Sequence, residues 1–427
     1  MITPNLINNM WVLLSAILVF MMTASVGLLE VGELGEDISQ SLLKGILITG
    51  IGVAVMAFIG FNTAFAPTID GIIGNPFYTG LFLGGFSTHV TGIISGVWWS
   101  MTSTYTGTGL TTGTYFLFEA AFAAVTFALV AVIALKKLKI EALVAFAIVY
   151  FIFIWNLPAA WIWNPTGWMY LMGVRDFAGG LVVHAAAGAT GLALVLKIWQ
   201  EERKKGLERS PQSTIRINPG MLTISILLLW VGWFGFNPGS ELALTNETTV
   251  VVLTTFIAAA MAFASTMFFQ YLFKRSNPGL LYAVNGILMG LIIITPLAGY
   301  VSPASAAILG TLGGPLFLAG ERFFGRFKWF SDPIGLFPGH MLGGIFGITM
   351  IAFFTQNAFA AASGAANLPN GLLFGGGFAA LGQLGLEVFG VAVVMSVVFV
   401  LSYATISLIG IATHGITTDY KKEGIIP

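Results

Sequence analysis

The sequence predicts an all-α, polytopic membrane protein with eleven transmembrane helices, and three observations carry this prediction. The 427 residues are 57% hydrophobic and only 8% charged, whereas a soluble domain carries about 25% charged residues. Eleven apolar stretches are long enough to cross a bilayer. The basic residues gather in every second loop between these stretches. Most of the outer surface is therefore expected to contact lipid.

Composition also excludes several classes of site. The 18 basic residues balance the 18 acidic ones, so nothing indicates a nucleic-acid partner. The absence of cysteine excludes disulfides, thiolate catalysis and cysteine-ligated metals. The N-terminus lacks a basic n-region and a small-residue cleavage site, so the first apolar stretch is expected to be a retained span.

Eleven spans of about 20 residues follow one another along the chain. They cover residues 9–29, 43–65, 115–135, 140–157, 177–198, 219–237, 249–272, 279–298, 303–320, 338–355 and 384–410. The fourth is short, because Pro158 is expected to end it. Residues 66–114, which include Trp98 and Trp99, form a long loop that is expected to cover or enter the external mouth.

The loop charges predict the orientation of the chain. Seventeen of the eighteen Lys and Arg residues lie on one side of the eleven-span arrangement, and Arg175 is the exception. The positive-inside rule therefore predicts an external N-terminus and a cytoplasmic C-terminus. Residues 199–218 form the most polar loop, which is expected to be a solvated connector, with docking of a regulator as the alternative.

Two stretches share one frame, in which an acid precedes a histidine by eight residues. They read Asp176-Phe-Ala-Gly-Gly-Leu-Val-Val-His184 and Asp332-Pro-Ile-Gly-Leu-Phe-Pro-Gly-His340. Glycines follow each histidine four and seven positions later, at Gly188, Gly191, Gly344 and Gly347. Eight helical residues rise roughly 12 Å, so both histidines are expected near the middle of the membrane. The glycines should let the two helices pack closely.

The two copies of the frame lie in the fifth and tenth spans. An offset of five spans reverses the direction of the copy, so the frame predicts an inverted-topology repeat. The chain is then a single transmembrane transporter domain over residues 1–427. It divides into repeat one (about 9–198), repeat two (about 219–355), an added eleventh helix (about 384–410) and a short cytoplasmic tail (411–427).

Each residue of the frame also has a purely structural interpretation. Asp176 and Asp332 suit N-caps, although Asp176 could also stabilise a cation at the external mouth. Either histidine could simply bond a neighbouring backbone, but ionisable groups at this depth favour a functional role. Two histidines without a nearby second acid give too few ligands for a metal. The absence of G-x-S-x-G argues against a hydrolase, and neither enzymatic activity nor a cofactor is expected.

Three aromatic clusters are expected at the external ends of their spans. They read Phe118-Glu-Ala-Ala-Phe122, Trp161-Ile-Trp163-Asn-Pro-Thr-Gly-Trp168 and Trp233-Phe-Gly-Phe236-Asn-Pro-Gly-Ser240. Interfacial aromatics usually anchor helices in the membrane. Because these clusters converge on one face with Ser240 and Asp176, they also suit a cage for an ammonium-like cation. Such a cation–π contact is worth about 2 kcal/mol or more when desolvated.

Two further acids, Glu119 and Glu387, lie within predicted spans. Glu119 is expected to be a neutral or hydrogen-bonded glutamate that packs against a neighbouring helix. Neither acid enters the expected mechanism.

These motifs resemble those of the ammonium transporter family, which includes the yeast methylammonium permeases and the Rhesus proteins. The resemblance extends from about Ala64 to the end of the eleventh span. Its motifs are DFAGGLVVHAAAGATG, WVGWFGFNPGSEL, ITPLAGYVSPASA, DPIGLFPGHMLGGIFG, FEAAF and WIWNPTGW. The second copy of the frame departs from the family pattern at Gly335, Pro338 and Gly339, which can change the orientation of His340.

The resemblance implies a homotrimer with one pore in each subunit, in a cell membrane, and ammonium or ammonia as substrate with methylammonium as an analogue. It assigns roles to eight residues: His184 and His340 as pore histidines, Phe122 and Phe236 as a stacked gate, Trp163, Ser240 and Asp176 at the external ammonium site, and Trp233 lining the pore. The acidic first cytoplasmic loop and the short tail argue against a PII-type regulator.

The expected mechanism starts with ammonium at the external site, among Trp163, Phe122, Phe236 and Ser240. The ion loses a proton and ammonia then passes the histidines, because moving the intact cation through an apolar pore costs many kcal/mol. The histidine pair can share hydrogen bonds and relay the proton, or ammonia can cross alone. Two other functions stay open, namely an ammonium sensor that transports little and a channel for another small neutral solute such as carbon dioxide.

Overall fold

The computed structural model describes residues 3–34, 38–78, 81–84, 109–134, 137–206, 217–274, 279–327, 332 and 335–418. Within these ranges, eleven helices are long and apolar enough to span a membrane, as predicted. The chain is therefore a multi-pass membrane protein. Trp98, Trp99 and half of the predicted charged connector (residues 207–216) lie outside the described residues.

Some of the eleven spans are single helices and others join two or three helical segments. The eleven spans are, in chain order, α1 (Pro4–Leu34), α2 (Ile38–Val55) with η1 (Met56–Gly60) and α3 (Phe61–Phe65), α6 (Thr112–Ala134), α7 (Ile140–Val149) with η2 (Tyr150–Ile154) and α8 (Asn156–Ile162), η3 (Gly180–Ala185) with α10 (Ala186–Lys204), α11 (Pro219–Gly239), α12 (Asn246–Lys274), α13 (Leu280–Ile294) with η4 (Thr295–Leu297), α14 (Pro303–Phe324), η5 (Leu336–Met341) with α15 (Leu342–Phe354), and α17 (Gly377–Ala412).

Shorter elements connect the spans. They are β1 (Thr68–Ile69), β2 (Ile73–Gly74), α4 (Leu81–Gly84), α9 (Trp168–Met172), α16 (Asn357–Ala362) and η6 (Leu372–Phe374). The two strands form a small antiparallel pair in which Thr68 faces Gly74 and Ile69 faces Ile73.

Helix starts follow ordinary capping chemistry. The Thr111 hydroxyl accepts from the N–H of Thr114 before α6. Asn218 and Ser302 cap α11 and α14 through their side chains, and each is followed by a proline at the first helical position. A proline fits there because the first-turn N–H has no helical partner.

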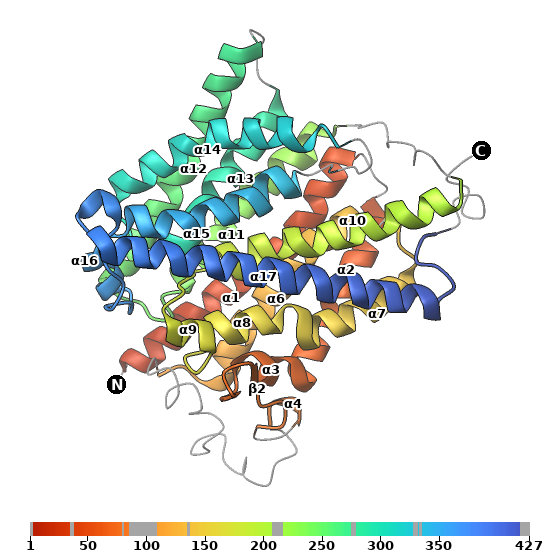
Figure 1. Ribbon diagram of the computed structural model, residues 1–427, viewed down its shortest axis with the longest axis horizontal. Coiled ribbons are helices and arrows are strands. Elements are labelled where there is room, and N and C mark those ends of the chain that lie inside the picture. Colours follow the sequence, from red (N-terminus) through yellow and green to blue (C-terminus); the bar gives the residue numbers. More distant parts are fainter. Residues whose placement is uncertain are drawn as a thin grey trace.

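The spans lie side by side, with α1 beginning at one end of the bundle and α17 ending at the other (Figure 1). We call these ends the N-terminal face and the C-terminal face. α10 runs toward the C-terminal face and α15 toward the N-terminal face, so the two histidine-bearing spans have the opposite directions expected of the repeat (Figure 1). α17 lies across the front of the bundle, where it contacts α10, α15 and α7.

Burial differs sharply between spans. In their most apolar stretches, 89% of the residues are buried in α6 and 83% in the span of η3 and α10, against 22% in α17. α6 and α10 therefore form the interior of the bundle. α17 presents most of its surface outward, in keeping with a helix added outside the repeat.

The fourth span is longer than predicted, because the helix continues through Pro158 to Ile162. The π-helical segment η2 ends four residues before this proline and widens the turn there. The side-chain amide of Asn156 donates to the carbonyls of Phe151 and Ile152, at 2.7 and 3.2 Å. These bonds give the carbonyls of the widened turn a side-chain donor.

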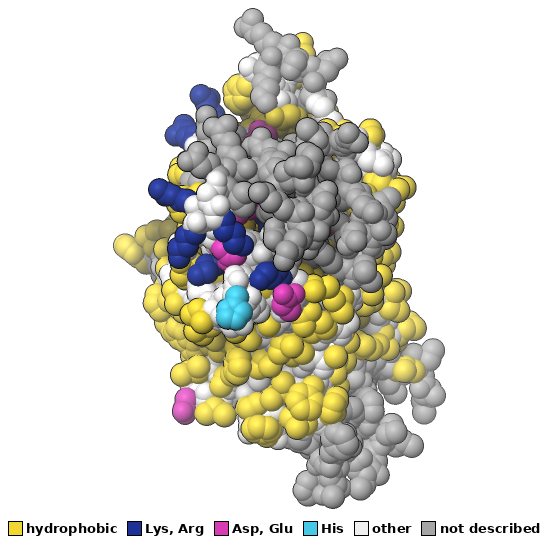
Figure 2. Space-filling model, turned by 90° about the vertical axis from the view of Figure 1, so that its right-hand side faces the viewer, with side chains coloured by type: hydrophobic (Ala, Val, Ile, Leu, Met, Phe, Trp, Pro, Cys, Tyr) yellow, Lys and Arg dark blue, Asp and Glu magenta, His cyan; other side chains and the backbone are white. Residues whose placement is uncertain are grey.

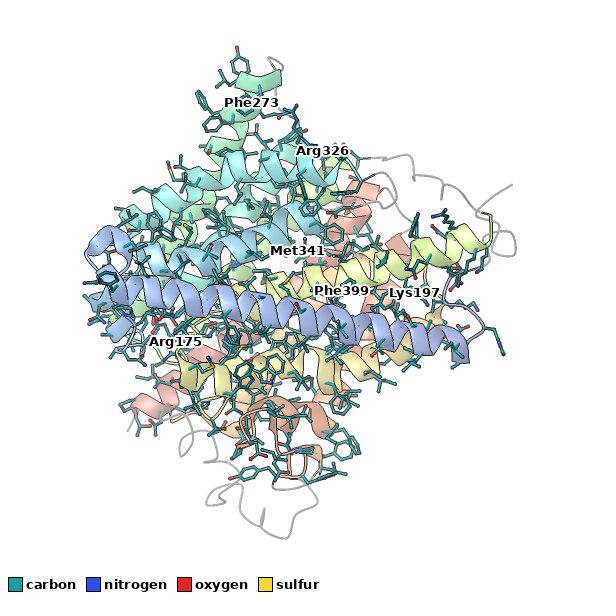
Figure 3. All side chains as sticks on the ribbon, in the orientation of Figure 1. Arg175, Lys197, Phe273, Arg326, Met341 and Phe399 are labelled. Carbon is teal, nitrogen blue, oxygen red and sulfur yellow. The ribbon has the colours of Figure 1, made fainter. Side chains whose placement is uncertain are left out.

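Charge is distributed unevenly between the two faces. Figure 2 looks onto the C-terminal face, where Lys and Arg side chains gather beside a broad apolar surface. Lys137 and Lys205 pair there with Glu202 and Glu201, at 3.3 and 2.9 Å. Arg175 lies instead toward the N-terminal face, opposite in direction to Lys197 (Figure 3).

Arg175 is buried, which explains why it is the exception to the gathering of Lys and Arg residues on one side of the spans. Only 7% of the residue is exposed. Its guanidinium donates to the carbonyls of Tyr170 and Val174, each at 2.9 Å, and to the side chain of Asn367 at 3.2 Å. It also lies over the Tyr170 ring at 4.6 Å. Arg175 is thus a structural cation inside the protein rather than a loop charge facing the aqueous phase.

Candidate functional site

The two histidine helices begin alike, with a short π-helical segment that carries the histidine at its fifth position. These segments are η3 and η5. The residue before each is a glycine in the left-handed region, Gly179 with φ of 116° and Gly335 with φ of 66°. Other residues adopt this conformation only at a cost, so both glycines are required by the local backbone.

Asp176 caps the first of these segments through both carboxylate oxygens. Gly179 and Gly180 donate to Oδ1, each at 2.8 Å, and Leu181 and Val182 donate to Oδ2 at 2.8 and 2.9 Å. Burial raises the pKa of Asp176, and the four N–H groups oppose this rise because they stabilise the carboxylate. Asp176 therefore caps the first histidine helix, as predicted.

Asp332 caps the second segment with fewer of these bonds. Leu336 donates to Oδ1 and Phe337 to Oδ2, both at 2.8 Å. The Gly335 N–H also contributes to the carboxylate's environment. Burial raises the pKa of Asp332 to about 6, and the backbone amides only partly offset this.

The structure brings His184 and His340 into direct contact. Their Nδ1 atoms are 3.2 Å apart, and the ring centroids are separated by 5.1 Å. Pro338 and Gly339 therefore leave His340 facing its partner. Two neutral imidazoles share one hydrogen in such a contact, so one Nδ1 donates while the other accepts. His184 Nε2 has no hydrogen-bond partner within the described ranges.

Glycines allow the close approach of the two helices, as predicted. A Cβ at Gly188 would overlap Met341, and one at Gly191 would overlap Leu336. A Cβ at Gly344 would overlap the Gly180 carbonyl. Gly347 departs from this pattern, because it faces the α13–η4 segment instead of the other histidine helix.

A narrow cavity surrounds the histidine pair, and we call it the pore cavity. It has a volume of about 10 Å³, close to the space needed by a single water molecule. Its lining comprises Met22, Val26, Leu29, Val125, Leu129, Val183, His184, Leu229, Trp233, Phe236, Leu288 and His340. Trp233 uses its indole N–H to donate to Thr295 at 3.0 Å. Apart from the histidines, the cavity thus presents apolar and aromatic surface.

Two phenylalanines separate the pore cavity from the N-terminal face. The centroids of Phe122 and Phe236 are 4.3 Å apart, and both side chains are buried. Phe236 also lies nearly parallel to the His184 ring, at 5.8 Å and 11°. The Phe236 ring therefore packs against Phe122 on one side and His184 on the other.

A second, wider cavity lies on the other side of the phenylalanine pair, and we call it the vestibule. It has a volume of about 150 Å³. Its lining comprises Tyr115, Phe118, Glu119, Phe122, Ile162, Trp163, Tyr170, Arg175, Asp176, Phe177, Ser240, Leu242 and Tyr300. Of the predicted site residues, Phe122, Trp163, Asp176 and Ser240 thus line one cavity, whereas Phe236 lines the pore cavity.

Hydrogen bonds fix two of these side chains. The Trp163 indole N–H donates to the Asp176 carbonyl at 2.8 Å, and its ring meets Phe122 edge to face at 5.7 Å. The Ser240 hydroxyl donates to the Phe236 carbonyl at 2.9 Å. The Ser240 oxygen keeps lone pairs for a donor, and the Trp163 ring stays available for a cation.

Sequence reasoning missed several parts of the vestibule. Tyr115, Tyr170 and Tyr300 line it without belonging to the twin frame or the aromatic motifs. Tyr115 could have been found, since it lies one helical turn before Glu119. Tyr300 comes from a turn after η4. It belongs to the motif ITPLAGYVSPASA, but that motif carries no predicted role in the external site.

Glu387 is a buried, hydrogen-bonded glutamate on α17. It accepts from the backbone N–H of Arg175 at 3.1 Å and from the Gln383 amide at 2.6 Å. These bonds connect α17 to the chain directly before Asp176. Glu387 therefore supports the cap of the first histidine helix without contacting either cavity.

Comparison with known proteins gives a consistent result. The sequence profile of the Ammonium Transporter Family matches residues 10–425. An ammonium transporter of Aquifex aeolicus is 30% identical over 353 residues, which cover 82% of this chain and 77% of that protein. An ammonium transporter of Bacillus subtilis is 28% identical, with 80% and 78% covered.

Solved structures share the same fold. A structure titled "Sensor Amt Protein" aligns with a TM-score of 0.80 and 24% identity, covering 97% of this chain and 96% of that one. Mep2 of Saccharomyces cerevisiae aligns with a TM-score of 0.80 and 22% identity, covering 97% and 90%. At these identities the similarity concerns the fold.

Proposed function

The chain belongs to the ammonium transporter family, and from this premise we propose that it binds ammonium in the vestibule, removes one proton and passes ammonia through the pore cavity. One observation carries the proposal, namely the order of the two cavities. A polar, aromatic-lined vestibule is followed by the buried Phe122–Phe236 pair and then by an apolar cavity that contains two histidines.

The vestibule suits a small cation. The rings of Phe122 and Trp163 offer π faces, and Ser240 offers a hydroxyl oxygen. Cation–π contacts of this kind are worth about 2 kcal/mol or more in a desolvated site. We infer that these three side chains hold ammonium and that Asp176 supports the site through the backbone that it caps.

The pore cavity suits ammonia rather than ammonium. A charge without counter-ion in apolar surroundings costs several kcal/mol at least, whereas a neutral molecule with few hydrogen bonds enters cheaply. His184 Nε2 gives ammonia a partner whichever tautomer is present. If His184 Nδ1 donates to His340, Nε2 is an acceptor, and in the other tautomer Nε2 is a donor.

Orientation and assembly belong to the same proposal. We infer that the N-terminal face is external, because the basic side chains of the described residues gather at the C-terminal face (Figure 2). We also infer a homotrimer with a pore in each subunit, as is typical of the family. A PII-type regulator is not part of the proposal.

Labelling of single cysteines tests the orientation cleanly, because the chain has no native cysteine. Thr245→Cys lies in the exposed segment directly before α12. Lys204→Cys lies at the last residue of α10, on the C-terminal face. A membrane-impermeant maleimide applied to intact cells should label the first variant only. Labelling of the second variant alone would reverse the orientation.

Uptake into proteoliposomes tests the transport itself. Purified protein should take up radiolabelled methylammonium, and ammonium should compete with it. Absence of uptake in protein that still binds ammonium would favour a sensor, and carbon dioxide flux without methylammonium uptake would favour a channel for another neutral solute.

Currents across the membrane test the histidines. An ammonium-dependent current in the parent that is lost in His184→Ala indicates that the pair relays a proton alongside ammonia. Methylammonium uptake without any ammonium-dependent current in either protein indicates that ammonia crosses alone.

A further inference from the structure

One buried acid of the vestibule, Glu119, has a carboxyl oxygen without a hydrogen-bond partner within the described ranges. Glu119 lies on α6, three residues before Phe122 and therefore on the same face of the helix. Only 4% of the residue is exposed, and it lines the vestibule with Phe122, Trp163 and Ser240. Tyr115 hydrogen-bonds its carboxyl group. Its Oε2 atom has no hydrogen-bond partner within the described ranges.

This free oxygen distinguishes Glu119 from the other acids nearby. Both oxygens of Asp176 accept backbone N–H groups, and both oxygens of Glu387 accept from Arg175 N. A buried carboxylate oxygen without a donor is energetically unfavourable, because it has given up its hydration without gaining a hydrogen bond. Such a group in a cavity that suits a cation indicates a ligand that supplies the missing donor.

The charged residues of the vestibule lining also favour a cation as the ligand of Glu119. Its lining contains two acids, Glu119 and Asp176, and one base, Arg175. With both acids ionised the lining carries one net negative charge, and removal of the Glu119 charge would make it neutral. Both carboxylate oxygens of Asp176 are occupied by backbone N–H groups, and the Arg175 guanidinium is held by three protein acceptors. Glu119 is thus the acid of this lining that keeps an oxygen without a partner within the described ranges.

We propose that Glu119 is the anionic ligand of the ammonium ion in the vestibule. Its Oε2 accepts one ammonium N–H, while Ser240 and the rings of Phe122 and Trp163 contact the other sides of the ion. This assignment rests on the proposed function. It adds a charged, specificity-determining residue to a cage otherwise made of aromatic rings and a hydroxyl group.

Three substitutions test the assignment in proteoliposomes. Glu119→Gln keeps the shape of the side chain and removes the charge, and Glu119→Asp keeps the charge but withdraws it by one methylene. Glu247→Gln is the matched control, because it removes an acid from the first turn of α12, outside the lining of the vestibule. Ammonium competition against methylammonium uptake gives the apparent affinity and the maximal rate of each protein.

The expected order of ammonium affinity is parent, then Glu119→Asp, then Glu119→Gln. We expect Glu119→Gln to weaken the affinity by about tenfold or more, which corresponds to about 1.4 kcal/mol. The maximal rate should change less than the affinity, and Glu247→Gln should behave like the parent. Glu119→Asp carries the test by itself if the glutamine variant does not fold.

An unchanged ammonium affinity in Glu119→Gln overturns the assignment. A loss of maximal rate and thermal stability at unchanged affinity also overturns it, because this is the signature of a purely structural acid. A parent protein without ammonium-competed uptake contradicts the proposed function itself, which keeps the two failures distinct.

Discussion

Four backbone N–H groups donate to Asp176, whereas Asp332 receives a smaller set at the matching place in the second copy. Every residue of the second copy follows its counterpart by 156 positions, as do the two histidines. Pro338 therefore corresponds to Val182. Val182 donates to Asp176 Oδ2, and a proline has no N–H to donate. One residue thus accounts for the weaker second cap.

The two copies also differ in what supports them from outside. Glu387 of α17 accepts from the Arg175 N–H, and Trp163 donates to the Asp176 carbonyl. The first cap is thereby fixed by the eleventh helix and by a wall of the vestibule. The comparison teaches that one repeat geometry can carry one histidine helix whose start is held by more hydrogen bonds and one whose start is held by fewer.

Removal of the two acids should give the largest difference between the copies. Asp176→Ala leaves four N–H groups without an acceptor, and bonds to a charged group are worth about 1.5–3 kcal/mol each. We expect uptake to fall by tenfold or more and the melting temperature in detergent to drop. Asp332→Ala should lower both quantities less. A larger loss in Asp332→Ala would contradict the ranking of the two caps.

Exchange of Val182 and Pro338, the residues that differ between the two caps, should have a smaller effect on stability. Val182→Pro removes one donor near the start of η3, where a proline ring is tolerated, and makes the first cap resemble the second. We expect a loss of about 1.5–3 kcal/mol in stability, measured as a lower melting temperature. The reciprocal Pro338→Val should be neutral or stabilising, and a destabilised Pro338→Val protein would show that the proline serves packing instead.

The smallest expected effect is a pH dependence from Asp332. Its pKa in the folded protein is about 6, above the ordinary value of 3.8, because of burial. The folded state therefore holds this proton more tightly than the unfolded chain does. The resulting stability is fully present below the ordinary value and is lost as the pH rises through about 6.

Melting temperatures of the parent and Asp332→Asn check this pH dependence. Between about pH 4 and pH 7, the parent should lose more stability than the variant, since the amide does not titrate. Glu241, whose pKa is raised to about 7 by burial, is present in both proteins and cancels in the difference. Parallel curves for the two proteins would show that Asp332 does not titrate in this range.

Much of the fold could be predicted from the sequence. Lipid demands an apolar exterior and a satisfied backbone, so hydropathy and length marked eleven spans. The odd offset of the twin frame predicted the opposite directions of α10 and α15, which the structure confirms. The helix through Pro158 could not be predicted, because it depends on the η2 turn and on the Asn156 side chain.

The sequence by itself determined which chemistry is available: two intramembrane histidines, their capping acids and three aromatic clusters. Only the tertiary structure decided which groups meet. The Nδ1 contact joins residues 156 positions apart, and the vestibule combines side chains from several spans and loops. The same packing saturates Asp176 and Glu387 but leaves Glu119 Oε2 without a donor. Hydrogen-bond saturation depends on distances between helices, which local sequence patterns do not encode.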